Sequence, residues 1–136
     1  MHNTEKTLSK CINSILKQNF SKIEIILIND GSTDKSKKTC NSFKRKFKGI
    51  KIFNHRKKLG VSASRNKGIK EAKGDFLIFL DSDDFLLNGC LNKLSNLVKK
   101  NTLSDLIIAK KFITLSMQNT FITHRVFNTK SSNKKN

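Results

Sequence analysis

The chain has 136 residues, which is enough for one domain with a modest hydrophobic core. Lys and Arg number 28 against 10 Asp and Glu, so the formal net charge of +18 favours anionic partners such as nucleic acid, phosphorylated metabolites or acidic lipid surfaces. No stretch approaches the roughly 18 apolar residues of a membrane span and no signal-peptide core is present, which predicts a cytoplasmic protein.

The apolar pattern predicts alternating helices and strands along most of the sequence. Helices are expected at about 4–18, 34–47, 60–74 and from 88, with strands at 23–28, 50–53, 75–80 and 105–109. Thr4 is expected to cap the first helix, Thr33 or Asp34 the second, and Gly74 to end the third. This alternation predicts an α/β fold with a doubly wound, mostly parallel sheet and flanking helices, although the sequence opens on a helix with no strand before it.

The cysteines and histidines form no recognisable site in the sequence. Cys11, Cys40 and Cys90 lack the Cys-x-x-Cys spacing of metal and redox motifs, and the first lies on an apolar helical stripe. They are therefore expected to be reduced thiols, mostly buried, in a cytosolic protein. The histidines are far apart in the sequence and show no metal-ligand pattern.

Three carboxylates follow the most apolar of the expected strands. Phe-Leu-Ile-Phe-Leu at 76–80 reads as a buried parallel strand, and Asp81, Asp83 and Asp84 come directly after it. Crowded carboxylates repel one another, and open α/β sheets bind ligands at the carboxyl ends of their strands. Oxygen ligands at that edge suit a hard divalent cation that holds phosphates. The alternative is a solvated turn that caps the next helix, the role expected for Asp84 in particular.

Two further segments follow the same logic more weakly. Asp30 ends another apolar strand, where it could accept hydrogen bonds from a nucleobase or ribose, or simply belong to a tight turn with Gly31. Arg65 lies in the first turns of the third helix, near the same edge, and could donate to a phosphate or base, or belong to an ordinary amphipathic helix. Lys57 and Lys58 are more typical of a solvated charge run than of a phosphate-binding loop.

Four segments in register resemble one known family. They are Asn-Thr-Glu at 3–5, Ile-Leu-Ile-Asn-Asp-Gly-Ser-Thr-Asp at 26–34, Gly-Val-Ser-Ala-Ser-Arg-Asn-Lys-Gly-Ile at 60–69 and Gly-Asp-Phe-Leu-Ile-Phe-Leu-Asp-Ser-Asp-Asp at 74–84. In this order and spacing they resemble the nucleotide-binding half of family 2 glycosyltransferases, which have the GT-A fold. The resemblance covers residues 2 to about 109.

The resemblance implies roles for the aspartates. Asp30 would bind the nucleobase of a nucleotide-sugar, usually UDP-linked. Asp81 would contact the ribose or sugar, with Ser82 beside it in the same nucleotide-sugar site. Asp83 would bind Mg²⁺ or Mn²⁺, which bridges the diphosphate and neutralises the charge that develops on this leaving group.

It also implies a set of supporting residues and a reaction. Arg65 would support the nucleotide, and Asn3 and Glu5 lie where the family's first loop touches it. Members of the family invert the anomeric centre, so a carboxylate must act as base on the acceptor hydroxyl. The implied acceptor is a glycan or a lipid-linked molecule in surface polysaccharide synthesis, with peripheral association at the inner face of an anionic membrane.

The sequence departs from the family pattern at both ends. Family members begin with an apolar strand that lies centrally, between the strands at 23–28 and 76–80, whereas here only Met1-His2-Asn3 precede the helix. Their base lies well beyond the metal motif, whereas Asp105 is the only carboxylate side chain after Asp84. The expectation is a partial domain at 1–112, an unassigned segment at 113–127 and a disordered basic tail at 128–136. The general base is unidentified, and the protein is expected to lack robust transferase activity.

Two other classes remain open at this point. A phosphoryl hydrolase of the haloacid-dehalogenase kind also places Asp-x-Asp after an apolar strand, with Asp81 as nucleophile, but there the motif opens the domain. A basic nucleic-acid-binding protein would explain the charge, but the sequence has no recognition motif and no clustered stacking aromatics, so nucleic acid is the less favoured partner.

Overall fold

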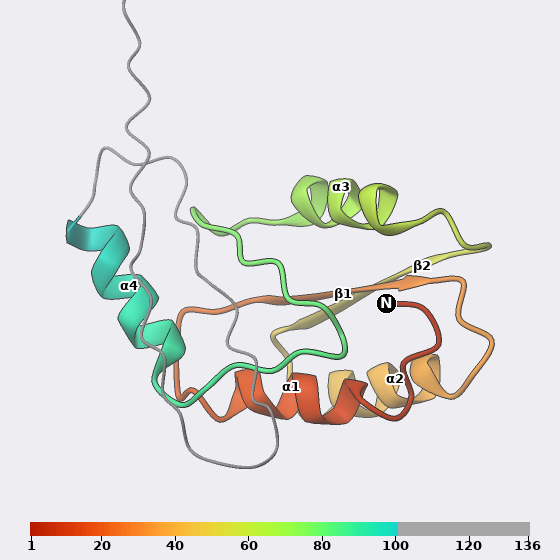
Figure 1. The fold of residues 1–136 in the computed structure, drawn as a ribbon, viewed down its shortest axis with the longest axis horizontal. Helices are drawn as coiled ribbons and strands as arrows, with labels where there is room; N and C mark the ends of the chain where they lie inside the picture. The colour runs from red at the N-terminus through yellow and green to blue at the C-terminus, as the bar shows by residue number, and fades with distance from the viewer. Residues whose placement is uncertain (101–136) are drawn as a thin grey trace, which may run out of the picture. The chain divides into compact units, whose positions relative to one another are not determined.

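A computed structural model describes residues 1–100, which form a helix-flanked sheet. In sequence order the elements are α1 (Leu8–Leu16), β1 (Ile25–Asp30), α2 (Ser36–Lys46), β2 (Ile50–His55), α3 (Val61–Glu71) and α4 (Cys90–Lys100) (Figure 1). The protein divides into two compact units, Met1–Leu91 and Asn92–Asn136, and the first carries every element up to α3. The expectations for 101–112, 113–127 and 128–136, including a strand at 105–109, lie outside the described residues. No helix within residues 1–100 is long and apolar enough to cross a membrane.

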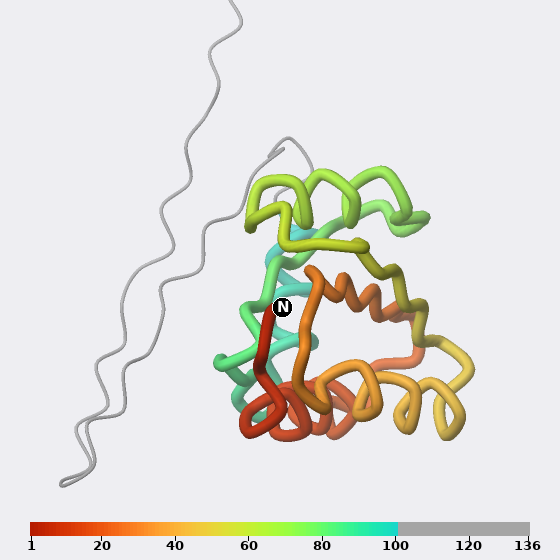
Figure 2. The backbone as a smooth tube through the Cα atoms, turned by 90° about the vertical axis from the view of Figure 1, so that its right-hand side faces the viewer, coloured from red at the N-terminus to blue at the C-terminus, as the bar shows by residue number. Residues whose placement is uncertain are grey.

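The sheet of the first unit is parallel. β1 and β2 pair in register from Ile25 with Ile50 to Asp30 with His55. Helices α1 and α2 cover one face, and α3 covers the other (Figure 1). Layers of helix on both sides of parallel strands confirm the predicted α/β class. The strands end at the edge of the molecule that faces the viewer in Figure 2, and Met1 lies at this same edge.

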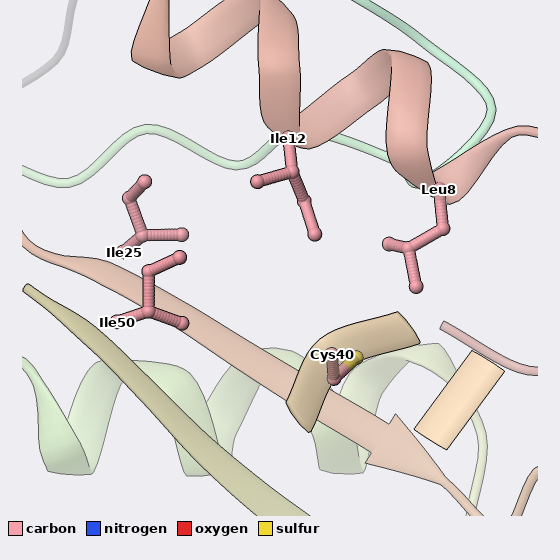
Figure 3. Close-up of a cluster of buried hydrophobic side chains, with 5 residues drawn as sticks. All are labelled: Leu8, Ile12, Ile25, Cys40 and Ile50. Atoms are coloured by element: carbon pink, nitrogen blue, oxygen red, sulfur yellow. The ribbon is translucent and has the colours of Figure 1, made fainter. Parts of the chain in front are cut away.

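The hydrophobic core lies between the sheet and its lower helices. Figure 3 shows Leu8 and Ile12 of α1 pointing toward Ile25 and Ile50 of the strands, with Cys40 of α2 beside them. Leu8 and Ile12 are one helical turn apart, so both face the sheet. Burying each such aliphatic side chain contributes roughly 1.5–3 kcal/mol before conformational entropy is subtracted.

The three cysteines are in the thiol form, as predicted, and Cys11 and Cys40 are buried. Burial is the main reason that the pKa of Cys11 is raised to about 11, and burial likewise raises the pKa of Cys40 to about 11. Both thiols are therefore protonated at neutral pH and serve as small apolar core residues.

The strand predicted at 75–80 does not form. The described sheet contains only β1 and β2, and Phe76, Leu77, Ile78 and Phe79 are between 47% and 62% exposed. The prediction of a buried strand is therefore wrong for these residues. The physical reason is that a strand exists only with a hydrogen-bonded neighbour, and no strand of residues 1–100 lies beside this segment.

Helix ends differ from the prediction in two places. The backbone carbonyl of Thr4 accepts from the N–H groups of Thr7 and Leu8, while its hydroxyl is buried without a hydrogen-bond partner, so the hydroxyl does not cap the helix. Helix α3 ends at Glu71, before Gly74, because Ala72 is already extended and the carboxylate of Glu24 accepts from the N–H of Gly74 at 2.9 Å.

The predicted cap of the second helix is confirmed. The Oδ1 atom of Asp34 accepts from the N–H of Ser36 at 2.9 Å, at the point where α2 begins. This carboxylate satisfies a donor that the first helical turn leaves without a partner, and its negative charge lies at the positive end of the helix dipole. Ser36 itself is fully buried.

Candidate functional site

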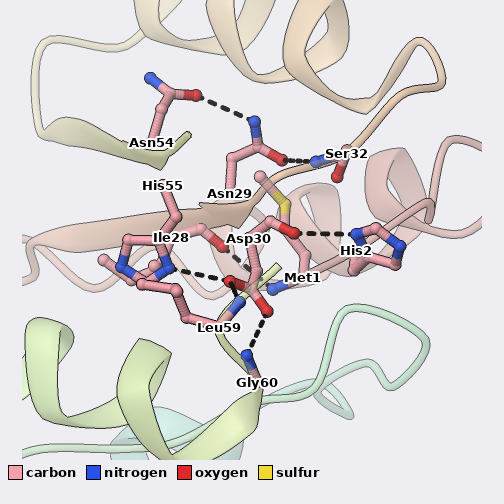
Figure 4. Close-up of polar contacts among 10 residues, drawn as sticks. All are labelled: Met1, His2, Ile28, Asn29, Asp30, Ser32, Asn54, His55, Leu59 and Gly60. Atoms are coloured by element: carbon pink, nitrogen blue, oxygen red, sulfur yellow. Dashed lines mark hydrogen bonds and ion pairs between the residues drawn. The ribbon is translucent and has the colours of Figure 1, made fainter. Parts of the chain in front are cut away.

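Asp30 is the last residue of β1, and it is buried. Its side chain accepts from Nδ1 of His55, the N–H of Leu59 and the N–H of Gly60, each at 2.8 Å (Figure 4). Burial alone would raise its pKa, but the hydrogen bonds from Leu59, His55 and Gly60 outweigh it and lower the pKa of Asp30 to about 2. Because an ionised carboxylate only accepts, Nδ1 of His55 carries the proton.

These contacts fix the loop that leads from β2 into α3. Gly60 has a positive φ of 95° and immediately precedes Val61, the first residue of α3. Asp30 therefore determines where α3 begins relative to the sheet edge. All three donors that meet its carboxylate come from the protein itself, so its predicted contact with a nucleobase stays a prediction.

A glycine is required at position 31 because the loop after β2 passes very close to it. It adopts a φ of +64°, and a Cβ atom there would lie 2.6 Å from both the carbonyl carbon of Lys57 and the backbone nitrogen of Lys58. Only a residue without a side chain permits this approach. The backbone of Lys57 and Lys58, which were predicted to belong to a solvated charge run, thus crosses directly over the residue that follows β1.

Asn29 binds the neighbouring strand and the turn together. Its side-chain N–H donates to Oδ1 of Asn54 on β2 at 3.0 Å, and its Oδ1 atom accepts from the N–H of Ser32 at 3.2 Å (Figure 4). Asn29 is only 3% exposed, so the end of β1 is fixed from both sides. Such fully paired polar groups give a rigid sheet edge.

The first residues of the protein lie along the same edge. The amino group of Met1 donates to the carbonyl of Ile28 at 3.0 Å, and the carbonyl of Met1 accepts from the N–H of Asp30 at 2.8 Å. Nδ1 of His2 lies 2.8 Å from the carbonyl oxygen of Asp30. Met1 and His2 therefore lie against the end of β1 and position the loop that carries Asn3 and Glu5.

Asn3 and Glu5 attach this loop to the β1–α2 turn. Oδ1 of Asn3 accepts from the N–H of Thr33 at 2.9 Å, and Oε2 of Glu5 accepts from the N–H of Lys35 at 2.9 Å. The N–H of Glu5 in turn donates to Asp34 at 3.0 Å. The structure brings both predicted residues to the site edge, where their side chains hold the two loops together.

Arg65 and Asp81 meet as an exposed ion pair. Nη2 of Arg65 lies 3.3 Å from Oδ1 of Asp81, with the two side chains 48% and 61% exposed, and the guanidinium lies over the ring of Phe79. An exposed pair of this kind contributes only about 0–1 kcal/mol, so either partner can exchange it for a ligand at little cost. The structure therefore joins two of the predicted site residues and leaves both accessible.

The carboxylates after residue 80 lie close together. Asp84, Asp83 and Asp81 all add to burial in raising the pKa of Cys11, whose Sγ lies 3.6 Å from the carbonyl oxygen of Asp81. The N–H of Asp84 donates to that same carbonyl at 3.0 Å and closes the turn. The turn presents the side chain of Asp83 to solvent and half-buries Ser82.

The carboxylates at residues 81–84 suit a metal ion that also binds water and substrate phosphates. They do not suit one that protein side chains hold by themselves. Within residues 1–100 no three His, Cys, Asp or Glu side chains form a cluster that could hold a metal ion by themselves. Mg²⁺, however, usually takes one or two carboxylates and completes its shell with water and substrate phosphates. The exposed carboxylate of Asp83 fits a cation of that kind, which would bind together with a diphosphate.

Sequence reasoning missed His55 as a site residue. The predicted strand ended at Phe53, whereas β2 continues to His55, which is paired in register with Asp30. Extending the predicted strand to His55 would have placed its imidazole beside the carboxylate of Asp30. The backbone donors of Leu59 and Gly60 carry no side-chain signal and could not have been found in this way.

Comparisons with known proteins identify the family. The family model described as glycosyl transferase family 2 matches residues 1–134. The chain belongs to this family. It is 44% identical over 103 residues to an uncharacterized glycosyltransferase of Haemophilus influenzae, covering 76% of this chain and 41% of that protein. It is 34% identical over 113 residues to the poly(ribitol-phosphate) beta-glucosyltransferase of Bacillus spizizenii, covering 81% of this chain and 18% of that protein.

A solved structure confirms the GT-A class of the fold. TarS 1–349 of S. aureus, in complex with UDP-GlcNAc, matches with a TM-score of 0.73 and 25% identity over 86% of this chain and 36% of that chain. The family 2 protein described here thus spans less than half the length of each of these relatives. Membership of this family favours the glycosyltransferase prediction over the hydrolase alternative.

Proposed function

We propose that the protein binds a nucleotide-sugar, with a UDP-sugar as the favoured donor, and serves a metal-dependent, inverting glycosyltransferase reaction. The acceptor is a glycan or lipid-linked molecule in surface polysaccharide synthesis. Support comes from the family, from a relative named for poly(ribitol-phosphate) glucosylation and from the complex of the TarS structure with UDP-GlcNAc.

The observation that carries the proposal is the placement of Arg65 and Asp81 relative to Asp30. Asp30 fixes Gly60 at the start of α3, and one helical turn later Arg65 reaches Asp81. Asp30 thus contacts the residue before α3, and Asp81 contacts Arg65 in the first turns of the same helix. Asp30 is the last residue of β1, and open α/β sheets bind their ligands at the carboxyl ends of parallel strands.

The roles of the residues follow from their exposure. Asp30 is buried and acts by holding the 59–60 loop in place, whereas Arg65 is exposed and can turn its guanidinium toward a phosphate oxygen. That movement would free Asp81 to accept a hydrogen bond from a ribose or sugar hydroxyl. Asp83 would hold Mg²⁺ or Mn²⁺, which, when bound, would neutralise charge on the diphosphate.

The first test is calorimetric titration of the full chain with UDP in the presence of Mn²⁺. Asp83→Ala is expected to weaken binding by about tenfold or more, which corresponds to about 1.4 kcal/mol. The matched control is Asp75→Ala, which removes an exposed carboxylate a few residues upstream and should bind UDP like the wild type.

Because the net charge is +18, the direction in which UDP affinity changes distinguishes a metal-binding role of Asp83 from nonspecific charge attraction. Removing any carboxylate makes the protein more positive, so nonspecific attraction of UDP would strengthen in both variants. Only a role of Asp83 in holding the cation makes binding fall in one variant and not in the other. Equal binding by Asp83→Ala and wild type would contradict the metal role, and failure of the wild type to bind UDP would contradict the donor site.

A further inference from the structure

The outer face of α2 is a strongly basic surface. Lys37, Lys38, Asn41, Lys44 and Arg45 recur at the spacing of one helical face, and all five are exposed. The opposite face of the helix is buried against the rest of the protein. Figure 1 shows α2 on the side of the sheet away from α3. The helix therefore packs through one face and presents four cations on the other.

These cations are concentrated beyond the general excess of lysine in the sequence. Residues 35–48 carry seven Lys and Arg and no Asp or Glu, whereas the other residues of 1–100 carry 15 Lys and Arg and nine Asp and Glu. None of the ion pairs among the described residues includes one of the seven. The carboxylates of Asp34 and Glu5, at the start of the helix, accept from the backbone N–H groups of Ser36 and Lys35. Within residues 1–100, the basic face thus meets no ion-pairing side chain.

The stability of the helix does not explain all of these cations. Lys44 and Arg45 lie in the last turn, where a cation interacts favourably with the negative end of the helix dipole. Lys37 and Lys38 lie in the first turn, at the positive end, where Asp and Glu are favoured and none is present. The cations of this face also repel one another. An anionic partner would offset both of these unfavourable terms.

An exposed aromatic residue lies at the end of the same helix. Phe47 directly follows α2, is 39% exposed and stacks on Phe43 with 6.4 Å between the ring centroids. Lys46 and Lys48 flank it in the sequence, and both are exposed. Cations beside an exposed aromatic ring are suited to an anionic bilayer, because the ring can enter the headgroup region while the cations meet lipid phosphates. A soluble polyanion would need only the cations.

We infer that α2 lies along the surface of an anionic bilayer, with its basic face toward the lipid phosphates and Phe47 in the headgroup region. From Lys37 to Arg45 this face is about 12 Å long, at 1.5 Å per residue. Each Lys or Arg close to an anionic leaflet strengthens binding by about fivefold. Because α2 begins just after the end of β1, this orientation brings the sheet edge that carries Asp30 beside the membrane. The inference goes beyond the proposed reaction and does not depend on the UDP site.

The main experiment measures binding of the full-length protein to sedimented vesicles of phosphatidylcholine with about one third phosphatidylglycerol. Lys38→Gln combined with Arg45→Gln removes two cations of the basic face, and glutamine keeps a similar helix propensity. The matched control combines Lys70→Gln with Lys73→Gln, which removes two exposed cations in and just after α3, on the other side of the sheet. Both variants have the same net charge, so they differ only in which surface has lost its cations.

The α2 variant is expected to bind the vesicles about tenfold or more weakly than the wild type, and the control less than about threefold more weakly. Equal weakening of the two variants would show attraction by net charge alone and would overturn the inference. A wild type that binds single-stranded RNA but not the vesicles would overturn it in favour of a nucleic-acid surface.

A second measurement tests the predicted position of Phe47. The sequence contains no Trp, so Phe47→Trp places a single fluorophore at the proposed contact. Its emission should move to shorter wavelength and saturate as the anionic vesicles are added. The matched reporter is Phe76→Trp, at a residue that is 62% exposed, and its emission should stay unchanged. No shift for Phe47→Trp, or an equal shift for both variants, would refute docking through the end of α2.

Discussion

Replacing Asp30 by Asn tests how the site edge is held. The carboxylate is 4% exposed and accepts from His55, Leu59 and Gly60, each at 2.8 Å. An amide has the same shape but offers one acceptor oxygen instead of two, and its NH₂ group would face a backbone donor or the imidazole N–H. Leaving a buried donor unsatisfied costs about 1–3 kcal/mol, and each hydrogen bond to a charged acceptor contributes about 1.5–3 kcal/mol. Asp30→Asn is therefore expected to lower the free energy of unfolding by about 3 kcal/mol or more.

The assay is urea unfolding of the full-length protein, followed by circular dichroism. Asp83→Asn is the matched control, because it makes the same change at an exposed carboxylate and should stay within about 0.5 kcal/mol of wild type. If Asp30→Asn unfolds at the same urea concentration as this control, Asp30 does not hold the loop and the reasoning fails.

The pH dependence gives an independent check on the same residue. The pKa of Asp30 falls from an ordinary value of 3.8 to about 2 on folding, so the folded state favours its ionised form. Its contribution to stability is fully present above the ordinary pKa and is lost as the pH falls through about 2. The wild type should lose stability across this window, and Asp30→Asn should lose less. Parallel curves for the two proteins would contradict the assigned pKa shift.

Two further predictions concern the backbone and the core. Gly31→Ala should destabilise the protein by about 2 kcal/mol or more, because the residue has a positive φ and its Cβ would meet the backbone of Lys57 and Lys58. Gly68 lies inside α3 with open space around it, so Gly68→Ala should instead stabilise the protein by about 0.5–1 kcal/mol. Similar urea midpoints for the two variants would contradict the close approach of residues 57–58 to Gly31. Cys40, fully buried with a raised pKa, should react with iodoacetamide at neutral pH far more slowly than free cysteine, and fast modification of the folded protein would contradict its burial.

Local patterns in the sequence predicted several of the helices and strands. The apolar spacing of Leu8 and Ile12 indicated α1, and the β-branched run at 23–28 indicated β1, which also has a parallel partner in β2. The segment at 76–80 has the same kind of signal, yet it is not a strand in the structure. A strand depends on a neighbour that is remote in sequence, so its own composition cannot decide whether it forms.

The candidate site was predictable only in part for a related reason. Asp30 and Asp81 were identified because each follows an apolar run predicted as a strand. Arg65 was identified because it lies in the first turns of the third helix, and the family resemblance supplied the roles of all three. The donors that hold Asp30 are mostly backbone N–H groups, which nearly every residue type supplies and no sequence pattern marks. The crossing of residues 57–58 over Gly31 depends on tertiary packing, and only the glycine itself hinted at it.

The most direct test of the donor site is an NMR titration of the full-length protein with UDP and Mg²⁺. We predict saturable changes confined to the amides of Leu59 and Gly60, the first turns of α3 around Arg65, and residues 81–84. A protein that attracts UDP only through its positive charge would instead show weak changes spread over the lysine-rich surface of α2, and that result would contradict the proposed site.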